Sequence, residues 1–451
     1  MRGDGRLAAR VGRRYSRAMT SAPLTSTVEP APGVATSLAP FRAGFWFGGF
    51  NGLTWIICLG TPMVLLAQQL GASAFQVGLA SSFVFLLLPV QVVSTAALAR
   101  FGFKGQMVFA WSVRAFFLLV PLGLAWSAPE RPAPWMPGLL VASVFGFCLF
   151  RAIGTAAHMP WMAAILPLGL RGRYFATDQA ITSLVGATVL VGCAALFASV
   201  PAHAAFRILY LAAMFGAIAA VWSLARLPSA PAPAAPPLRS MAAWTLALCL
   251  RRGRFRHYLL LMLAGSVVSS SFAAFTVYYL KVVHALPSSE LMLFTAAQFA
   301  GQIAGTWGIR HLIDGVPLRR FFQVAVALVG AVELFWLALL NGAEALLPWL
   351  GGAYFLFGMG TGMAHVAHFT YLPELSNEAE RPITIAIFTA ALGLLSGLAP
   401  ILWGLALKGS GPAPAIDVER FVLFFAIGAT LSGLLLVLYA RLPDLRPTFE
   451  R

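Results

Sequence analysis

The chain has 451 residues, of which 59% are hydrophobic and only 10% are charged. Soluble domains carry roughly 25% charged residues, so this composition excludes a soluble globular protein. The formal net charge of +16 is explained by loops that flank a membrane, so we expect the lipid bilayer and its anionic headgroups as partners, and no nucleic acid.

Long apolar stretches alternate with short polar breaks from residue 44 to residue 441. Each stretch has about 20 residues or more, the length that a helix needs to cross a hydrocarbon core of roughly 30 Å. Every backbone amide must be satisfied inside lipid, so such runs form helices. The sequence therefore predicts an all-α integral membrane protein with twelve transmembrane helices. The predicted spans are residues 44–67, 75–98, 106–127, 137–160, 177–199, 203–226, 257–280, 290–309, 319–340, 346–369, 382–407 and 419–441.

A Pro- and Arg-rich interruption divides these spans into two sets of six. It holds five prolines between Pro228 and Pro237, a composition that favours an extended tether. The Arg-rich first segment predicts a disordered tail, with an amphipathic surface helix as the alternative. The predicted organisation is a cytoplasmic tail at 1–43, a six-helix bundle at 44–227, a cytoplasmic linker at 228–256, a second six-helix bundle at 257–441 and a cytoplasmic tail at 442–451.

Basic residues fall mainly on one side of the predicted spans. If the breaks are counted alternately, 24 of the 31 Lys and Arg residues lie on the side of the linker and both termini, and 5 lie on the other side. Because Lys and Arg in short loops are retained in the cytoplasm, we expect both termini to be cytoplasmic. The expected location is a multi-pass protein of a bacterial inner (plasma) membrane.

The sequence shows no signature of a metal site, a haem site or a disulfide. Its four cysteines are widely spaced, and we interpret them as small apolar residues. We therefore expect no cofactor and no metal. Gly358, Gly360 and Gly362 look like a nucleotide-binding loop, but they lie in an apolar helix, where small residues let helices approach closely. The cysteines are Cys58, Cys148, Cys193 and Cys249.

The two halves carry traces of a parallel repeat. The run GTAAH at 154–158 in the fourth span is similar to GTGMAH at 360–365 in the tenth, with one insertion. With two sets of six helices around a central linker, the chain resembles the major facilitator superfamily over residues 44–441. The resemblance implies two bundles that rock about a solute site near the middle of the membrane.

The break after the second span resembles the family's loop between helices 2 and 3. It keeps the loop's Arg, second Gly and final Lys as Arg100, Gly102 and Lys104, whereas Ala99 replaces the family's aspartate. In the second half, Asp314 and Arg319 occupy the acidic and last basic places. The resemblance implies that these residues gate the transporter; the alternative is that Arg100 and Lys104 are basic anchors at the cytoplasmic surface.

Arg151 in the fourth span is similar to an arginine that the family associates with proton transfer or substrate contact. A guanidinium inside a span costs about 2.5 to 3.5 kcal/mol on insertion scales, so it should face a partner or a wet cavity. A structural ion pair with Asp178, near the start of helix 5, is the alternative. The fifth span lacks the proline-containing glycine motif of the family's proton antiporters, which makes antiport less favoured.

The resemblance places helices 1, 4, 7 and 10 around the central cavity, and their polar residues become candidates for contact with the solute. Serines on helix 7 are equally explained by packing. His158, His365 and His368 titrate near physiological pH and could carry protons, or could satisfy local hydrogen bonds. Glu333 is a deep charge on helix 9, which the family places outside the cavity. The cavity candidates are Asn51, Trp55, Ser266, Ser270, Tyr278, Tyr354, His365 and His368.

These features favour a secondary transporter that moves a small solute by alternating access, with coupling to protons through Arg151, Asp178 or a histidine as one option. The alternative is a scaffold or assembly factor that keeps the fold but no longer transports. An enzyme is a weaker third reading, because no paired carboxylates or H-E-x-x-H motif lie at one membrane depth. One chain supplies both halves, so a monomer would be sufficient for the fold, and the sequence leaves the oligomeric state open.

Overall fold

The structure, a computed structural model, describes residues 38–127, 132–231, 253–310, 312, 316–375, 381–408 and 417–442. Most of the predicted first tail, most of the linker, the last tail and Asp314 lie outside these ranges. Within them the chain is helical and forms no strand.

The first half of the chain forms the N-terminal bundle. Its first three predicted spans are each interrupted: Gly60 separates α2 from α3, Leu87 separates α4 from α5, and residues 117–118 separate α6 from α7. Its helices are η1 (Ala39–Phe41), α2 (Arg42–Leu59), α3 (Thr61–Gln69), α4 (Ala74–Leu86), α5 (Leu88–Ser94), η2 (Thr95–Ala97), α6 (Leu98–Phe116), α7 (Leu119–Ser127), α8 (Met136–Ile165), α9 (Leu168–Ser199) and α10 (Ala202–Arg226).

The second half forms the C-terminal bundle, in which the first span is again broken, at Ser270 and Ser271. Its helices are α12 (Arg254–Ser269), α13 (Phe272–Val282), α14 (Ser288–Arg310), α15 (Leu318–Leu340), η3 (Glu344–Trp349), α16 (Leu350–Tyr371), η4 (Leu372–Leu375), α17 (Arg381–Ala406) and α18 (Val418–Ala440).

Local sequence explains where two of these helices begin. Ser73 and Gln76 form a capping box at the start of α4: Gln76 N donates to Ser73 Oγ at 3.3 Å, and Ser73 N donates to Gln76 Oε1 at 2.9 Å. Asp417 caps α18 by accepting from Arg420 N at 3.1 Å. Both caps satisfy amides that the first turn of a helix leaves without partners.

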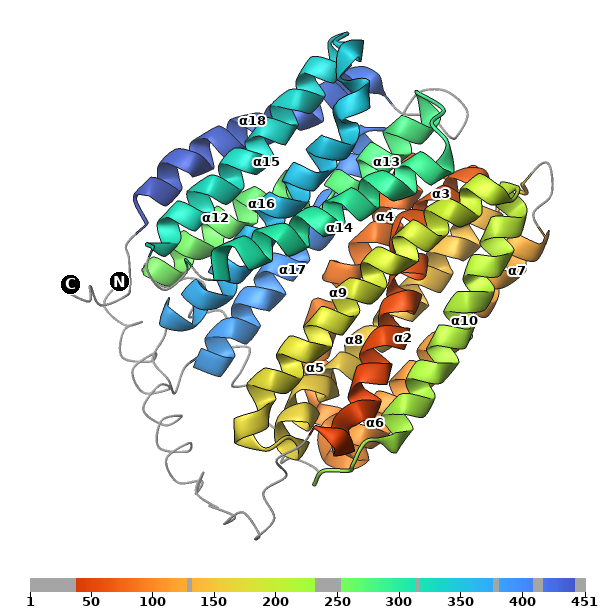
Figure 1. The fold of residues 1–451 in the computed structure, drawn as a ribbon, viewed down its shortest axis with the longest axis vertical. Coiled ribbons are helices and arrows are strands. Elements are labelled where there is room, and N and C mark those ends of the chain that lie inside the picture. Colours follow the sequence, from red (N-terminus) through yellow and green to blue (C-terminus); the bar gives the residue numbers. More distant parts are fainter. Residues whose placement is uncertain are drawn as a thin grey trace, which may run out of the picture.

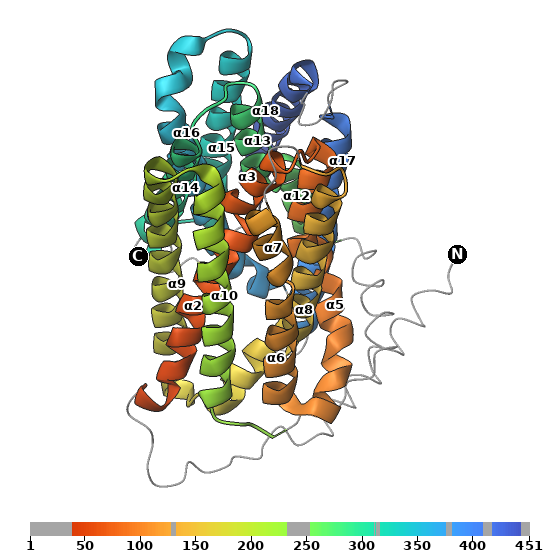
Figure 2. The same ribbon diagram turned by 90° about the vertical axis from the view of Figure 1, so that its right-hand side faces the viewer.

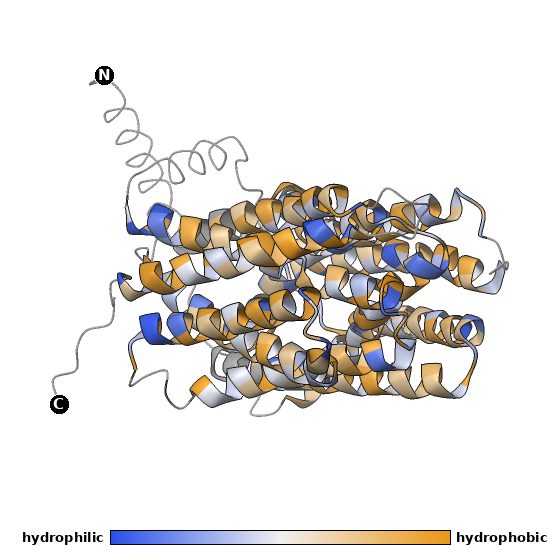
Figure 3. Cartoon of the chain, turned by 90° about the horizontal axis from the view of Figure 1, so that it is seen from above, coloured by the Kyte–Doolittle hydropathy of each residue, from blue (hydrophilic) through white to orange (hydrophobic). Residues whose placement is uncertain are grey.

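Nine stretches of the described chain are long and apolar enough to cross a bilayer. One of them, Ala74–Ser127, has 54 residues, far more than one crossing needs at 1.5 Å per residue, so it makes two passages. α14 and α16 are less apolar, and with them the described helices make the twelve predicted passages. Hydrophilic residues gather toward the two ends of the helices, and most of the length between them is hydrophobic (Figure 3).

The bundles are joined at one end of the molecule and diverge toward the other (Figure 1). We name the end where α10 stops and α12 starts the linker end, and the opposite one the far end. One apolar core at the far end includes buried residues of both bundles, such as Ile57, Met63, Phe275 and Tyr278. At the linker end each bundle has a core of its own. Hydrophobic contact therefore holds the two bundles together mainly through the far end.

The helices that join the bundles most extensively are α4 with α17 and α9 with α14, and smaller contacts join α5 with α17, α3 with α13 and α14, and α4 with α13. Along α4 and α17 the contact is made by backbone. A Cβ atom at Gly404 would lie 2.8 Å from the Ala74 carbonyl oxygen, and one at Gly397 would lie 2.6 Å from Leu86 N. These glycines therefore allow the two helices to pack at a distance that side chains would prevent.

A second glycine contact joins α14 to α16 inside the C-terminal bundle, which Figure 2 shows behind the N-terminal one. Added Cβ atoms at Gly301 and Gly358 would fall on the carbonyl oxygens of Phe355 and Gln298. Gly360 faces α15 instead, where an added Cβ atom would lie 2.8 Å from the Ala325 carbonyl oxygen. The structure thus confirms the packing interpretation of the glycines in the tenth span.

We predict that Gly358→Ala destabilises the protein and that Gly352→Ala on the same helix does not. The added methyl group at position 358 meets the carbonyl of Gln298, and overpacking of this kind costs about 1–3 kcal/mol. Position 352 has open space around it, so alanine there should gain about 0.5–1 kcal/mol in helix propensity. Thermal melting of both variants in detergent measures the difference. Equal melting temperatures would contradict the close contact of α14 and α16.

Candidate functional site

A cavity of about 370 Å³ lies among the helices of the C-terminal bundle. Its walls come from α12, α15, α16, α17 and α18, and Phe85 of α4 reaches it from the N-terminal bundle. The cavity therefore lies within the C-terminal bundle and borders the N-terminal bundle at Phe85. Its volume falls within the range of roughly 300–1,000 Å³ for small-molecule sites. Four of the predicted site residues line it: Ser266, Ser270, Glu333 and His365.

Glu333 is the acidic group of this cavity. Its carboxylate accepts a hydrogen bond from Ser432 Oγ of α18 at 2.6 Å, and 3% of the residue is exposed. A Cβ atom at Gly428 would lie 2.7 Å from Glu333 Oε1, so this glycine makes the space that the carboxylate occupies. Glu333, a predicted site candidate on a helix that the resemblance places outside the central cavity, lines this cavity of the C-terminal bundle from α15.

Arg151 lies on the other side of α4 from this cavity. Its Nη2 donates to the Val84 carbonyl at 2.6 Å, and its guanidinium carbon lies 4.9 Å from the Trp55 ring centroid. Val84 and Phe85 are neighbours on α4, so one short segment touches both Arg151 and the cavity. Arg151 Nε has no hydrogen-bond partner among the described residues.

The alternative partner of Arg151 is not used. Asp178 lies beside Gly48 of α2 and Thr182, and it makes no ion pair with Arg151. Arg151 is therefore stabilised by a carbonyl dipole and an aromatic face, both weaker than a carboxylate would be.

Asn51, a predicted solute contact, binds a second buried arginine through its amide oxygen. Asn51 Oδ1 accepts from Arg114 Nη1 at 2.8 Å and from Trp111 Nε1 at 3.3 Å. The Arg114 guanidinium carbon lies 4.0 Å from the Phe147 ring centroid and 5.0 Å from that of Trp111. This group fills the interior of the N-terminal bundle, so Asn51 acts there as the acceptor for a buried cation.

Tyr278 and Tyr354 are fully buried in the shared core rather than exposed in a cavity. Tyr278 donates to the Ala72 carbonyl at 3.1 Å and so links α13 to the loop between α3 and α4. Tyr354 donates to Thr276 Oγ1 at 2.7 Å within the C-terminal bundle. Both hydroxyls are committed to the protein.

His158 and His368 pack against aromatic rings. His158 lies 5.5 Å from Phe47 between ring centroids. His368 Nδ1 is 2.8 Å from the Tyr258 hydroxyl, and its ring lies 4.8 Å from that of Phe388. The structure places these two histidines in the separate linker-end parts of the two bundles, away from the cavity.

The loop that follows the second span turns at Gly102, whose φ of 66° favours glycine. Lys104 Nζ donates to the Leu227 carbonyl at 2.8 Å, just beyond the end of α10. Arg100 is exposed and lies over the ring of Phe101. Arg319 is exposed at the start of α15, and its predicted acidic partner Asp314 lies outside the described residues. Lys104 is thus hydrogen-bonded to the residue that follows α10. The gating role of this loop stays a prediction.

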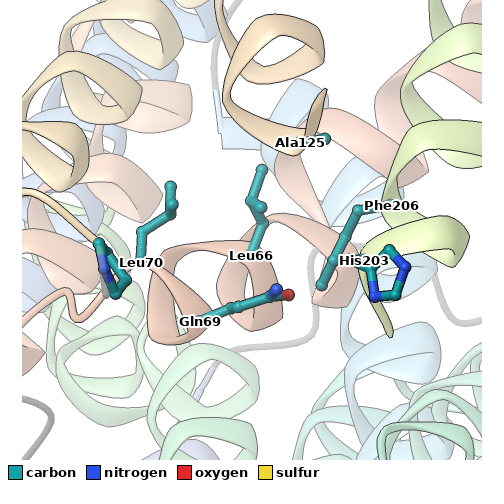
Figure 4. Close-up of a pocket in the computed structure, with 7 residues that line it drawn as sticks. Leu66, Gln69, Leu70, Ala125, His203 and Phe206 are labelled. Atoms are coloured by element: carbon teal, nitrogen blue, oxygen red, sulfur yellow. The ribbon is translucent and has the colours of Figure 1, made fainter. Parts of the chain in front are cut away.

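Other hollows in the described structure are less suited to a solute. The one in Figure 4, between Gln69, Leu70 and His203 at the far end of the N-terminal bundle, holds about 10 Å³, enough for one water at most. A groove of about 510 Å³ between α2 and α9 is lined by apolar side chains and Arg42. Its described wall contains no carboxylate and no hydroxyl.

Several cavity residues were missed by the sequence analysis: Phe85, Ser269, Thr361, Ser396 and Ser432. Serine and threonine in a transmembrane helix usually pack or bond to their own backbone, so their types give no signal. The spacing of Gly428 and Ser432, four residues apart on one face of α18, is the hint that was available.

No family model matches the chain, and no curated protein matches it. Solved structures do. The nucleoside transporter NupG superposes with a TM-score of 0.65 at 12% identity over 89% of this chain and 98% of its own. A D-xylose-proton symporter gives 0.65 at 14% over 91% and 99%. A bacterial homologue of the iron transporter ferroportin, in its inward-facing state, gives 0.63 at 14% over 90% and 98%.

These likenesses extend over nearly the whole of each chain and confirm the fold that the sequence resemblance implied, that of the major facilitator superfamily. The predicted fold class, an all-α multi-pass membrane protein, is confirmed with it. At identities of 11–14% the comparison shows the fold and leaves the solute open.

We predict that Asn51→Ala lowers the melting temperature and that adding Arg114→Met restores it. The single change leaves a buried guanidinium without its amide acceptor, at a cost of about 1–3 kcal/mol. The second change removes the buried charge, and such replacements are often neutral or stabilising. The control is Asn341→Ala, where the amide is exposed and bonds to its own helix. A double variant less stable than Asn51→Ala would show that Arg114 has another stabilising partner.

Proposed function

We propose that this protein is a secondary transporter that carries a small solute by rocking its two bundles. The supporting observation is the one-sided connection between them: they share a core at the far end and have separate cores at the linker end. A cavity with polar walls lies between these regions. This is the arrangement that alternating access requires in one of its two states.

The contacts that close the far end are of a kind that can break. Thr61 of α3 and Thr295 of α14 share a hydrogen bond of 2.6 Å, and Tyr278 bonds to the Ala72 carbonyl. Each is a neutral hydrogen bond, with a net value of about 1 kcal/mol. In each of these hydrogen bonds one partner belongs to a short helix that follows a break. Thr61 lies on α3, after the break at Gly60, and Tyr278 lies on α13, after the break at Ser270. Short segments beyond a break can shift without deforming the longer helices.

The sidedness of the membrane follows from the loop charges in this proposal. Basic residues accumulate on the linker side, so the linker end is cytoplasmic and the structure represents an inward-open state in the inner membrane. The domain boundaries that we propose are the sequence-based ones, with bundles at 44–227 and 257–441.

Arg151 is the N-terminal group that we assign to transport, with Trp55 as its support. Arg151 bonds to Val84 of α4, and the next residue, Phe85, lines the cavity, so a shift of this segment would change the surroundings of both. Coupling to protons is a further part of the proposal, with Asp178 or a histidine as the carrier in the N-terminal bundle.

We predict that a disulfide between Thr61→Cys and Thr295→Cys stops the conformational cycle. The two Oγ1 atoms are 2.6 Å apart, close enough for cysteines there to pair. All variants in this experiment have serine in place of the four native cysteines. A further change, Ser266→Cys, places one reactive thiol in the cavity wall. In oriented vesicles, an impermeant thiol reagent should label Ser266→Cys from both sides when the lock is reduced, and only from the linker side when it is oxidised. Labelling from the linker side alone in both conditions would favour the scaffold alternative, and this readout needs no knowledge of the solute.

We predict that Arg151→Ala abolishes transport of any solute found by a thermal-shift screen of sugars, amino acids, organic acids, nucleosides and amines. Arg207→Ala is the matched control, because Arg207 also bonds to a main-chain carbonyl and lies over a tryptophan, at the far end of the same bundle. Uptake into proteoliposomes measures both. Equal uptake by the two variants would remove Arg151 from the mechanism.

A further inference from the structure

We propose that the cavity of the C-terminal bundle binds a small organic cation, a protonated amine on an apolar body, with Glu333 as its counter-ion. This inference rests on the proposed function, since it names the class of solute that the transporter carries. It follows from the charge, the hydrogen-bonding state and the shape of the cavity wall.

Glu333 is the one carboxylic acid among the described lining residues of the cavity. Glu333 makes no ion pair with any described residue, and its one hydrogen bond comes from Ser432. The described lining residues include no Lys or Arg. A buried carboxylate without a partner is costly, and a cation that enters the cavity would supply the missing charge.

The hydroxyls of the wall present lone pairs to the cavity, because their hydrogens are already used. Ser266 donates to the Leu263 carbonyl at 2.8 Å and Ser269 donates to the Gly265 carbonyl at 2.6 Å. Thr361 donates to the Gly358 carbonyl at 2.9 Å. The hydroxyl of Ser432 donates its hydrogen to the Glu333 carboxylate. A wall of this kind accepts hydrogen bonds, so its ligand should donate them, as an ammonium group does with up to three hydrogens.

The rest of the polar lining consists of Ser270, His365, Ser396 and Tyr439. The Ser270 hydroxyl has no partner among the described residues, so it can accept or donate. His365 already interacts with other residues of the protein. An anionic ligand would meet the Glu333 carboxylate, which repels it, so the arrangement disfavours anions.

The remaining wall is apolar and selects the body of the ligand. It includes Met262, Phe322, Val329, Leu392 and Leu431. A volume of about 370 Å³ suits a ligand with one ring or a short alkyl chain rather than an ammonium ion alone. A free polyol would leave many of its hydroxyls against these side chains without partners.

The position of the carboxylate is built into the packing of α15 on α18. Gly428 leaves room for Oε1, and Gly330 lets the Ser432 side chain approach, with its Cβ 3.1 Å from where a Cβ at position 330 would lie. Two small positions thus hold the carboxylate and its donor in place at the cavity wall. A methyl group at position 428 would displace the carboxylate.

The test uses three probes that share one apolar body: 4-phenylbutylamine, 4-phenylbutanol and 4-phenylbutanoate. The full-length protein in detergent is titrated with each probe at pH 7 by calorimetry. We expect the amine to bind, and the alcohol and the acid to bind at least about tenfold more weakly, since a hydrogen-bonded charge contributes more than 1.4 kcal/mol. Glu333→Gln should weaken amine binding by about tenfold or more and leave the alcohol unchanged.

The controls separate a lost site from a lost fold. Glu344→Gln makes the same change at an exposed carboxylate and should bind the amine like the unchanged protein. Glu333→Asp, which withdraws the carboxylate by one methylene, is measured in case Glu333→Gln does not fold, and should weaken amine binding. Gly428→Ala should do the same, whereas Gly433→Ala, which has open space around it, should not. The amine should also protect Ser266→Cys from alkylation, which places the ligand in this cavity.

Three results would overturn the inference: no amine binding by the unchanged protein at millimolar concentration, equal affinity for the alcohol or the acid, or full amine binding by Glu333→Gln. Each of them leaves the transport proposal intact, because the labelling of Ser266→Cys from two sides uses no ligand. Conversely, one-sided labelling with normal amine binding would remove transport and keep the cation site.

Discussion

Close approach of helix backbones at glycine positions is the constraint on which this structure depends. Within a bilayer, apolar surface gives little drive for helices to associate, because lipid tails are as apolar as leucine. Contact between helices must come from dense packing, and glycine permits the densest. The α14 and α16 backbones meet at Gly301 and Gly358, and α4 meets α17 at Gly397 and Gly404. The first contact makes the C-terminal bundle rigid, and the second holds the two bundles together at the far end.

Buried charge is distributed unequally between the bundles. The N-terminal bundle contains Arg114 and Arg151, and the C-terminal bundle contains Glu333. Aromatic rings and carbonyl or amide oxygens stabilise the two arginines in place of carboxylates. Glu333 is held by one serine at the edge of a cavity. The two arginines therefore have all their shown partners within the protein, whereas the Glu333 carboxylate lies where a ligand in the cavity could reach it.

The broken helices connect these static features to motion. α2 is separated from α3 at Gly60, and α12 from α13 at Ser270, so the first helix of each bundle is interrupted. The short segments beyond the breaks touch each other and carry the hydrogen bonds that close the far end. A change that separates them would open that end while the longer helices keep their packing. The close contact of α14 with α16 lies within one bundle and can stay unchanged during such a motion.

The sequence by itself determined the helices, because hydropathy and length decide what can cross a bilayer. It also indicated the fold, through two sets of six spans and the degenerate loop at Arg100 and Lys104. It could not decide which way each polar side chain faces, since that depends on how a helix is rotated against its neighbours. Asn51 and Tyr354, which the resemblance places at the central cavity, are bound to Arg114 and Thr276, whereas Glu333, on a helix that the resemblance places outside that cavity, lines a cavity of the C-terminal bundle with Ser432. Only tertiary packing decided these partners, because they come from helices far apart in the chain whose contacts no local pattern encodes.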